Sequence, residues 1–167
     1  MKNILLGLTF VFLSILQLGC FNKKGIQKSD VTMSNNKEVN FTVIKGGVNS
    51  GYKEKGYIVI NNEQQLKEIW NKIFSIMIPP PSVPYIDFEN STLIGVFMGE
   101  KPTGGYGIEI TKITEQKNKI TVDIKEISPA PDCIVTMVLT SPYKIIKINK
   151  TNKKIKFKIE EVVKECN

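Results

Sequence analysis

Residues 92–127 read TLIGVFMGEKPTGGYGIEITKITEQKNKITVDIKEI, and this stretch decides the fold of the chain. Its first part, 92–98, is nearly all apolar, which is typical of a central strand buried on both faces. Residues 105–113 and 120–127 instead alternate apolar and polar side chains, as strands with one buried face do. The polar residues 116–119 between them indicate a hairpin turn. The stretch therefore predicts three strands of a β-rich domain.

Further strands are predicted on both sides of this stretch, over 40–48, 57–60, 133–139, 143–148 and 154–163. In the last of these, Lys154, Lys156 and Lys158 alternate with apolar residues, so lysines line one face and protect the strand against aggregation. We expect an α+β, mostly β class: an antiparallel β sandwich or barrel-like domain with one packed amphipathic helix, forming a single domain over 41–167.

The helix is predicted to follow Asn62, which can act as N-cap with Gln65 three residues on. An apolar stripe then recurs at helical spacing, made by Leu66, Ile69, Trp70, Ile73 and Phe74. The stripe predicts a helix that packs on the core, with Trp70 as core filler rather than a ligand platform. Four prolines within 78–84 then predict an extended crossing, which either connects elements stiffly or presents a peptide-like surface to a partner.

The N-terminus reads MKNILLGLTFVFLSILQLGC, with Lys2 before a largely apolar run and Gly19 before Cys20. This layout predicts a signal peptide over 1–19, and it is too short for a comfortable membrane span. The Gly-Cys ending is similar to a bacterial lipobox, although Gln17 stands where Leu is usual. We expect lipidation of Cys20, by palmitate or a related acyl chain, and a flexible tether over 20–40. The alternatives are an ordinary cleaved signal or an uncleaved anchor.

Composition narrows the function classes. Cleavage after residue 19 leaves 148 residues, enough for one domain with a core. The net charge is +7, and every positively charged side chain is a lysine, because the chain has no arginine. Arginine supplies most bidentate contacts to guanine and phosphate, so the sequence argues against nucleic-acid binding. Two cysteines remain after Cys20, namely Cys133 and Cys166. They either form a disulfide, which would stabilise the fold by roughly 3–4 kcal/mol, or are free thiols.

The chain has no histidine, which excludes Ser-His and Cys-His nucleophiles and the common histidine-bearing zinc sites. Two cysteines cannot build a four-cysteine zinc site. Ser141 and Lys144 are a formal Ser-Lys dyad, but a serine before Pro142 is better explained as turn chemistry. No pair of carboxylates is placed in a pocket by the pattern. We therefore expect no enzymatic activity, no catalytic residues, no metal and no cofactor, with an unassigned enzyme as the alternative.

The glycine-rich segment 101–107, KPTGGYG, is not a phosphate loop, because lysine precedes the glycines and a strand follows them. It predicts a tight turn in which Pro102 fixes φ and Gly104 and Gly105 permit positive φ. Tyr106 is expected to be half-buried and to hold the turn to the core. The alternative is an exposed recognition loop on a rigid β scaffold.

The sequence resembles the PrcB C-terminal domain family. The resemblance rests on MGEKPTGGYGIEI at 98–110, LIGVFMG at 93–99, Asp87-Phe88, Ser128-Pro129, the TSPY at 140–143, and GYIVINNEQQLKEIW at 56–70. It covers roughly residues 51–150. The namesake of this family is a lipoprotein subunit of a bacterial surface protease complex. The resemblance implies a non-catalytic accessory or stabilising subunit.

KPTGGY is also similar to the Asn-Pro-Thr-Thr-Gly-Tyr loop of chagasin-like cysteine-protease inhibitors, which are Ig-like sandwiches. Lys101 and Gly104 depart from that loop, and no Gly-x-Gly-Gly loop or Arg-Pro-Trp is present. Both resemblances imply a β scaffold that presents two turns to another protein. The candidate partner-binding residues are Pro102, Thr103, Gly104, Gly105, Tyr106, Pro142 and Tyr143. The alternative is that Tyr106 and Tyr143 are buried structural staples.

Together these observations predict an exported lipoprotein, held by a lipid anchor to a bacterial membrane in the cell envelope. Its expected role is to bind a protein partner, with a protease complex as the setting that the resemblance implies. A chagasin-like protease inhibitor and a module that binds anionic envelope polymers are the alternatives.

Overall fold

The computed structural model describes residues 36–166. The strands are β1 (Lys37–Glu38), β2 (Thr42–Gly47), β3 (Gly56–Ile60), β4 (Ser91–Phe97), β5 (Gly107–Glu115), β6 (Lys119–Pro129), β7 (Tyr143–Asn149) and β8 (Lys154–Lys164), and the helix is α1 (Glu63–Ile73). Cys20, the predicted signal peptide and most of the predicted tether lie outside the described residues. No helix within 36–166 is long and apolar enough to cross a membrane.

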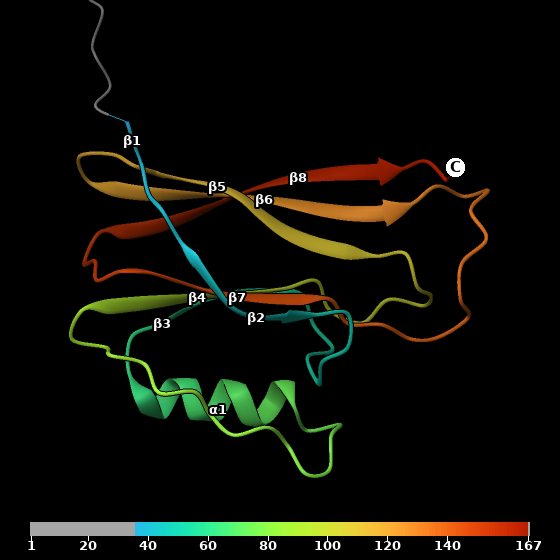
Figure 1. Cartoon of the computed structure of the whole chain (residues 1–167). Coiled ribbons are helices and arrows are strands. Elements are labelled where there is room, and N and C mark those ends of the chain that lie inside the picture. The colour runs from blue at the N-terminus through green and yellow to red at the C-terminus, as the bar shows by residue number, and fades with distance from the viewer. Residues whose placement is uncertain (1–35, 167) are drawn as a thin grey trace, which may run out of the picture. The chain divides into compact units, whose positions relative to one another are not determined.

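The strands form two four-stranded sheets that pack face to face, with α1 as a third layer (Figure 1). One sheet has the order β1-β5-β6-β8 and the other the order β2-β7-β4-β3. The sheets stay separate in the described part of the chain, so the prediction of a mostly β sandwich with one helix is confirmed, and the barrel-like alternative is not seen.

The predicted central strand is buried along its whole length. All seven residues of β4 are buried between β3 and β7. Ile94 and Val96 point toward the other sheet and join the core between the sheets. Leu93 and Phe97 point the opposite way and join a second core beneath α1. An unbroken apolar run is therefore required here, because both faces of the strand contact apolar layers.

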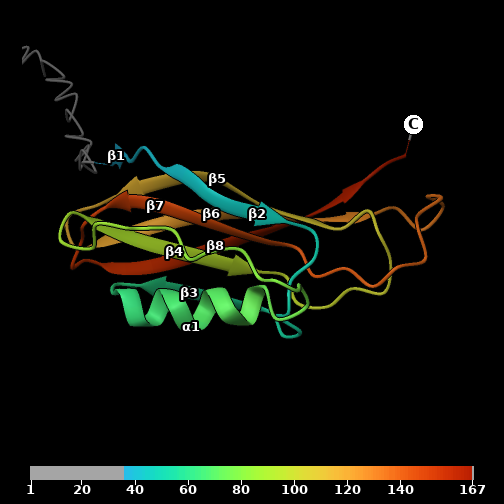
Figure 2. The same ribbon diagram turned by 60° about the horizontal axis from the view of Figure 1, so that its bottom comes forward.

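The helix begins and packs as its sequence predicts. The Asn62 side chain accepts a hydrogen bond from the backbone N–H of Gln65 at 2.9 Å, which satisfies one of the free N–H groups of the first turn. Leu66, Trp70 and Ile73 are buried against the sheet. The Pro-rich crossing runs back along the helix (Figure 1, Figure 2). Trp70 Nε1 donates to the carbonyl of Pro81 at 3.0 Å.

Two details differ from the sequence expectation. The pair β6–β8 is parallel. Between these two strands the chain passes through β7, which belongs to the other sheet. β7 carries the chain back to the end where β6 began, so β8 runs in the same direction as β6. In addition, Lys37 and Glu38 pair with β5, and Val39 packs on the core. The last residues of the segment predicted as a tether over 20–40 therefore belong to the folded domain.

Candidate functional site

Two connections meet at one end of the sandwich. They are the turn 98–106 between β4 and β5 and the loop 130–142 between β6 and β7 (Figure 1). The Lys101 N–H donates to the carbonyl of Thr140 at 2.7 Å, and the Thr140 N–H donates back to Lys101 at 3.0 Å. The Gly104 N–H donates to the carbonyl of Thr136 at 2.9 Å. The two connections therefore form one surface.

Loop 130–142 exposes four large apolar side chains. Ile134 is fully exposed, Met137 is 84% exposed, and Val138 and Leu139 are 58% and 62% exposed. We name these four residues, together with the turn 101–106 that supports them, the apolar end. Soluble proteins rarely leave several large apolar side chains bare on one loop unless a partner covers them. The exposure makes loop 130–142 a candidate interaction surface; segment 76–85, with Ile78 99% and Tyr85 93% exposed, is a second candidate.

The loop is fastened at both of its ends. Cys133 is joined to Cys166 by a disulfide with a Cα–Cα distance of 5.5 Å. At the other end, Thr140 Oγ1 donates to the carbonyl of Thr103 at 2.7 Å. These bonds fix the backbone near the exposed side chains. Binding of a partner therefore costs less conformational entropy than it would with a loop that is free to move.

Gly104 and Gly105 are required because turn 101–106 lies too close to loop 130–142 and the end of β6 to leave room for a side chain. Gly105 has φ +85°, and a Cβ there would lie 3.0 Å from the Cβ of Pro129. A Cβ at Gly104 would collide with the hydroxyl of Thr136. The Gly-Gly pair therefore allows the turn to lie against loop 130–142.

The structure separates the two tyrosines that the sequence grouped as binding residues. Tyr106 is half-buried against the core between the sheets, and its ring centroid lies 5.8 Å from Lys101 Nζ. Tyr143 is buried beneath α1, parallel to the Phe97 ring with centroids 6.4 Å apart, and this burial raises its pKa. Pro142 is buried as well. The burial agrees with the alternative in which Tyr143 is a structural staple, and it removes Pro142 and Tyr143 from the candidate surface.

The prediction of a strand over 133–139 is wrong, and for this reason the sequence missed the apolar end. The segment pairs with no strand; only the adjoining Thr140 forms an isolated bridge, with Lys101. Five of its seven residues are aliphatic or methionine, which reads as a buried strand. Pro131 before the segment and Pro142 after it are the signals that favour a loop.

The Ser141 hydroxyl and the Asp87 carboxylate are engaged in structural contacts. The Ser141 hydroxyl is buried, donates to the carbonyl of Tyr52, and lies 2.9 Å from Ser50 Oγ. The Asp87 carboxylate accepts from the Asn90 side chain at 2.9 Å, which lowers the pKa of Asp87. Within residues 36–166, no three histidine, cysteine or acidic side chains gather in an arrangement that could hold a metal ion.

One buried carboxylate was not predicted. Glu126 on β6 is 5% exposed, accepts from Tyr57 Oη at 2.5 Å, and pairs with Lys55 Nζ at 2.7 Å. Desolvation, followed by the hydrogen bond to Glu126, raises the pKa of Tyr57 to about 12. The hydrogen bond to Glu126 also raises the pKa of Lys55. Because β3 and β6 belong to different sheets, the hydrogen bond from Tyr57 to Glu126 joins the two sheets.

This cluster predicts a loss of stability in alkali. The pKa of Tyr57 is about 12 in the folded chain against 10.0 unfolded, so its contribution is complete below about pH 10 and is lost as the pH rises through about 12. We expect a Tyr57→Phe variant to lose less stability over this pH range than the wild type. Thermal unfolding at stepped pH measures the difference, and equal pH slopes for the two proteins would contradict the assignment.

Comparison with known proteins gives two matches. Residues 92–149, from β4 to the end of β7, match the family model described as PrcB C-terminal. The uncharacterized protein MJ1373 of Methanocaldococcus jannaschii is 32% identical over 151 residues, which are 89% of this chain and 91% of that protein. No solved structure matches. The family match contains both connections of the apolar end.

Proposed function

The chain belongs to the PrcB C-terminal family, and from this premise we propose that it is a non-catalytic, protein-binding subunit at the cell envelope. The observation that carries the proposal is the apolar end, where four large apolar side chains lie exposed on a fastened loop. The family resemblance supports a protease complex as the setting. No cofactor is part of the proposal.

The apolar end is suited to be the centre of a protein interface. Full burial of a side chain such as Leu or Met contributes about 1.5–3 kcal/mol. A partner that covers Ile134, Met137 and Leu139 would therefore gain several kcal/mol from these three residues alone. Interfaces concentrate their binding energy in a few buried residues, and methionine is enriched at interfaces relative to the rest of the protein surface. Turn 101–106 would form part of the rim.

The location is proposed from the N-terminal sequence. A signal peptide over 1–19 would export the chain, and lipidation of Cys20 would hold it on the membrane. Segment 20–35 would then join the anchor to the described domain. In this arrangement the domain remains close to the envelope proteins that are its proposed partners.

The test is affinity capture of the tagged mature protein from its own membranes, followed by an assay of protease activity in the captured material. We expect one specific envelope protein to copurify, and if it is a protease, to keep its activity. Loss of activity at a stoichiometric ratio would replace this proposal with the chagasin-like inhibitor. Capture of nothing above background would overturn the protein-binding role.

A further inference from the structure

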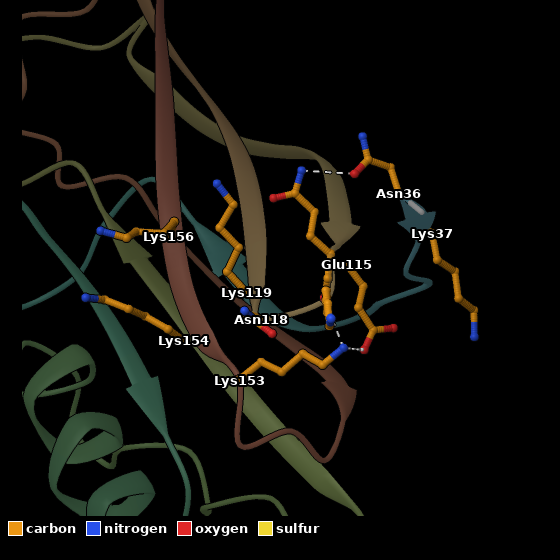
Figure 3. A pocket seen from close by; sticks show the side chains of 10 residues that line it. Asn36, Lys37, Glu115, Asn118, Lys119, Lys153, Lys154 and Lys156 are labelled. Atoms are coloured by element: carbon orange, nitrogen blue, oxygen red, sulfur yellow. Dashed lines mark hydrogen bonds and ion pairs between the residues drawn. The ribbon is translucent and has the colours of Figure 1, made fainter. Parts of the chain in front are cut away.

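The end of the sandwich opposite the apolar end carries a recess lined by lysines. It lies around the hairpin between β5 and β6 and the turn between β7 and β8, and has a volume of about 1450 Å³ (Figure 3). Its lysines are Lys37, Lys117, Lys119, Lys153, Lys154 and Lys156. We name this set the lysine recess.

The lysine recess has more positive charge than its own carboxylate can balance. Glu115 lines the recess and pairs with Lys153 at 2.8 Å. That hydrogen-bonded pair, and to a smaller extent Lys37, lower the pKa of Glu115. In the part of the chain that the structure describes, no salt bridge engages the other five lysines of the recess, which are Lys37, Lys117, Lys119, Lys154 and Lys156. Their charges are available to an anionic ligand.

The recess lies at the end of the sandwich where the described chain starts. Asn36 and Lys37 line it, so the chain enters the domain at this end (Figure 1). β6 runs from Lys119 in the recess to Pro129, where loop 130–142 begins. An 11-residue strand spans about 36 Å, which is the approximate separation of the two ends.

We propose that the lysine recess binds the phosphate headgroups of an anionic membrane surface and turns the apolar end away from the membrane. The inference rests on the proposed envelope location, because a chain anchored through Cys20 would approach the bilayer from the Asn36 end. Lysine ammonium groups act on phosphate as hydrated point charges, and each one held near an anionic bilayer strengthens binding. The apolar end would then face the partner rather than the lipid.

The test uses the mature chain from residue 20 with Cys20→Ser, so that no lipid contributes. Both hydrophobic cores are built from residues after 38, so this chain keeps them complete. Binding is measured by cosedimentation with phosphatidylglycerol-containing vesicles and with neutral phosphatidylcholine vesicles, at low salt where screening is weak. We expect binding to the anionic vesicles to be at least about tenfold stronger than to the neutral ones.

Two matched quadruple variants locate the site. Changing Lys117, Lys119, Lys154 and Lys156 to Gln should weaken binding to the anionic vesicles at least about tenfold. Changing Lys45, Lys53, Lys67 and Lys164 to Gln removes the same charge from exposed positions elsewhere and should leave binding close to that of the wild type. Equal weakening in the two variants would show attraction by net charge alone and overturn the proposal.

Two further readouts keep the conclusions separate. Binding of soluble polyphosphate to the recess at a salt concentration that already releases the protein from anionic vesicles would make the recess a polymer site and overturn the membrane assignment. The mass of the native N-terminus shows whether Cys20 carries lipid, and an unlipidated terminus would refute the anchor without changing the vesicle result. Vesicle binding with no captured protein partner would likewise remove the protein-binding role and leave the recess standing.

Discussion

Replacing Met137 and Leu139 with aspartate is expected to abolish capture of the envelope partner and to leave the domain folded. Both side chains are largely exposed, so the free protein loses little packing when they are changed. In the complex, each aspartate would place an uncompensated charge in a contact that excludes water, which is strongly unfavourable. Together the two changes should weaken binding by at least about 100-fold.

The control for this experiment lies on the same molecule. Ile78 and Tyr85, in and beside the Pro-rich crossing, are 99% and 93% exposed, and a double change to aspartate there adds the same charge away from the apolar end. We expect this control to capture the partner as the wild type does, and both variants to show unchanged thermal unfolding. The reverse result, with capture lost only in the control, would move the binding surface to the Pro-rich crossing.

The elements that could be predicted from the sequence are those with a regular pattern that matches their burial. The run around Ile94 is apolar throughout because both faces of β4 are covered. The stripe that contains Trp70 has helical spacing because one face of α1 is covered. The hairpin between β5 and β6 follows from two alternating segments joined by polar residues. In each case the side chains that the local pattern marks as apolar are the ones that the fold buries.

The parts that were missed depend on contacts between residues distant in sequence. The parallel pairing of β8 with β6 is decided by β7 crossing to the other sheet, which no local pattern encodes. The burial of Glu126 depends on Tyr57, 69 residues earlier. The apolar end was missed because an apolar segment was assumed to be buried, whereas it lies exposed. An apolar segment can be buried by the fold of its own chain or by a bound partner, and the sequence pattern does not distinguish the two cases.

Removing the disulfide by changing Cys133 and Cys166 to serine should lower the free energy of unfolding by roughly 3–4 kcal/mol, because the bond closes a loop across 33 residues in the unfolded chain. The described contacts also predict a local effect. Cys166 holds the start of the loop, while Ala130 N–H donates to the carbonyl of Lys164 at 3.0 Å on β8. Without the bond, this hydrogen bond and the adjoining pairing of Pro129 with Lys164 hold the beginning of the loop to the C-terminal strand.

Denaturant unfolding with and without reductant measures this contribution. Reductant should destabilise the wild type to the level of the double-serine variant, and should leave the variant itself unchanged. Under conditions where both proteins remain folded, the variant should also bind the captured partner more weakly, because ordering of the loop bearing Ile134 and Met137 would then oppose binding. Equal stability of wild type and variant under oxidising conditions would show that the bond contributes nothing to the fold. Equal partner affinity would show that the Thr140 contacts suffice to present the apolar end.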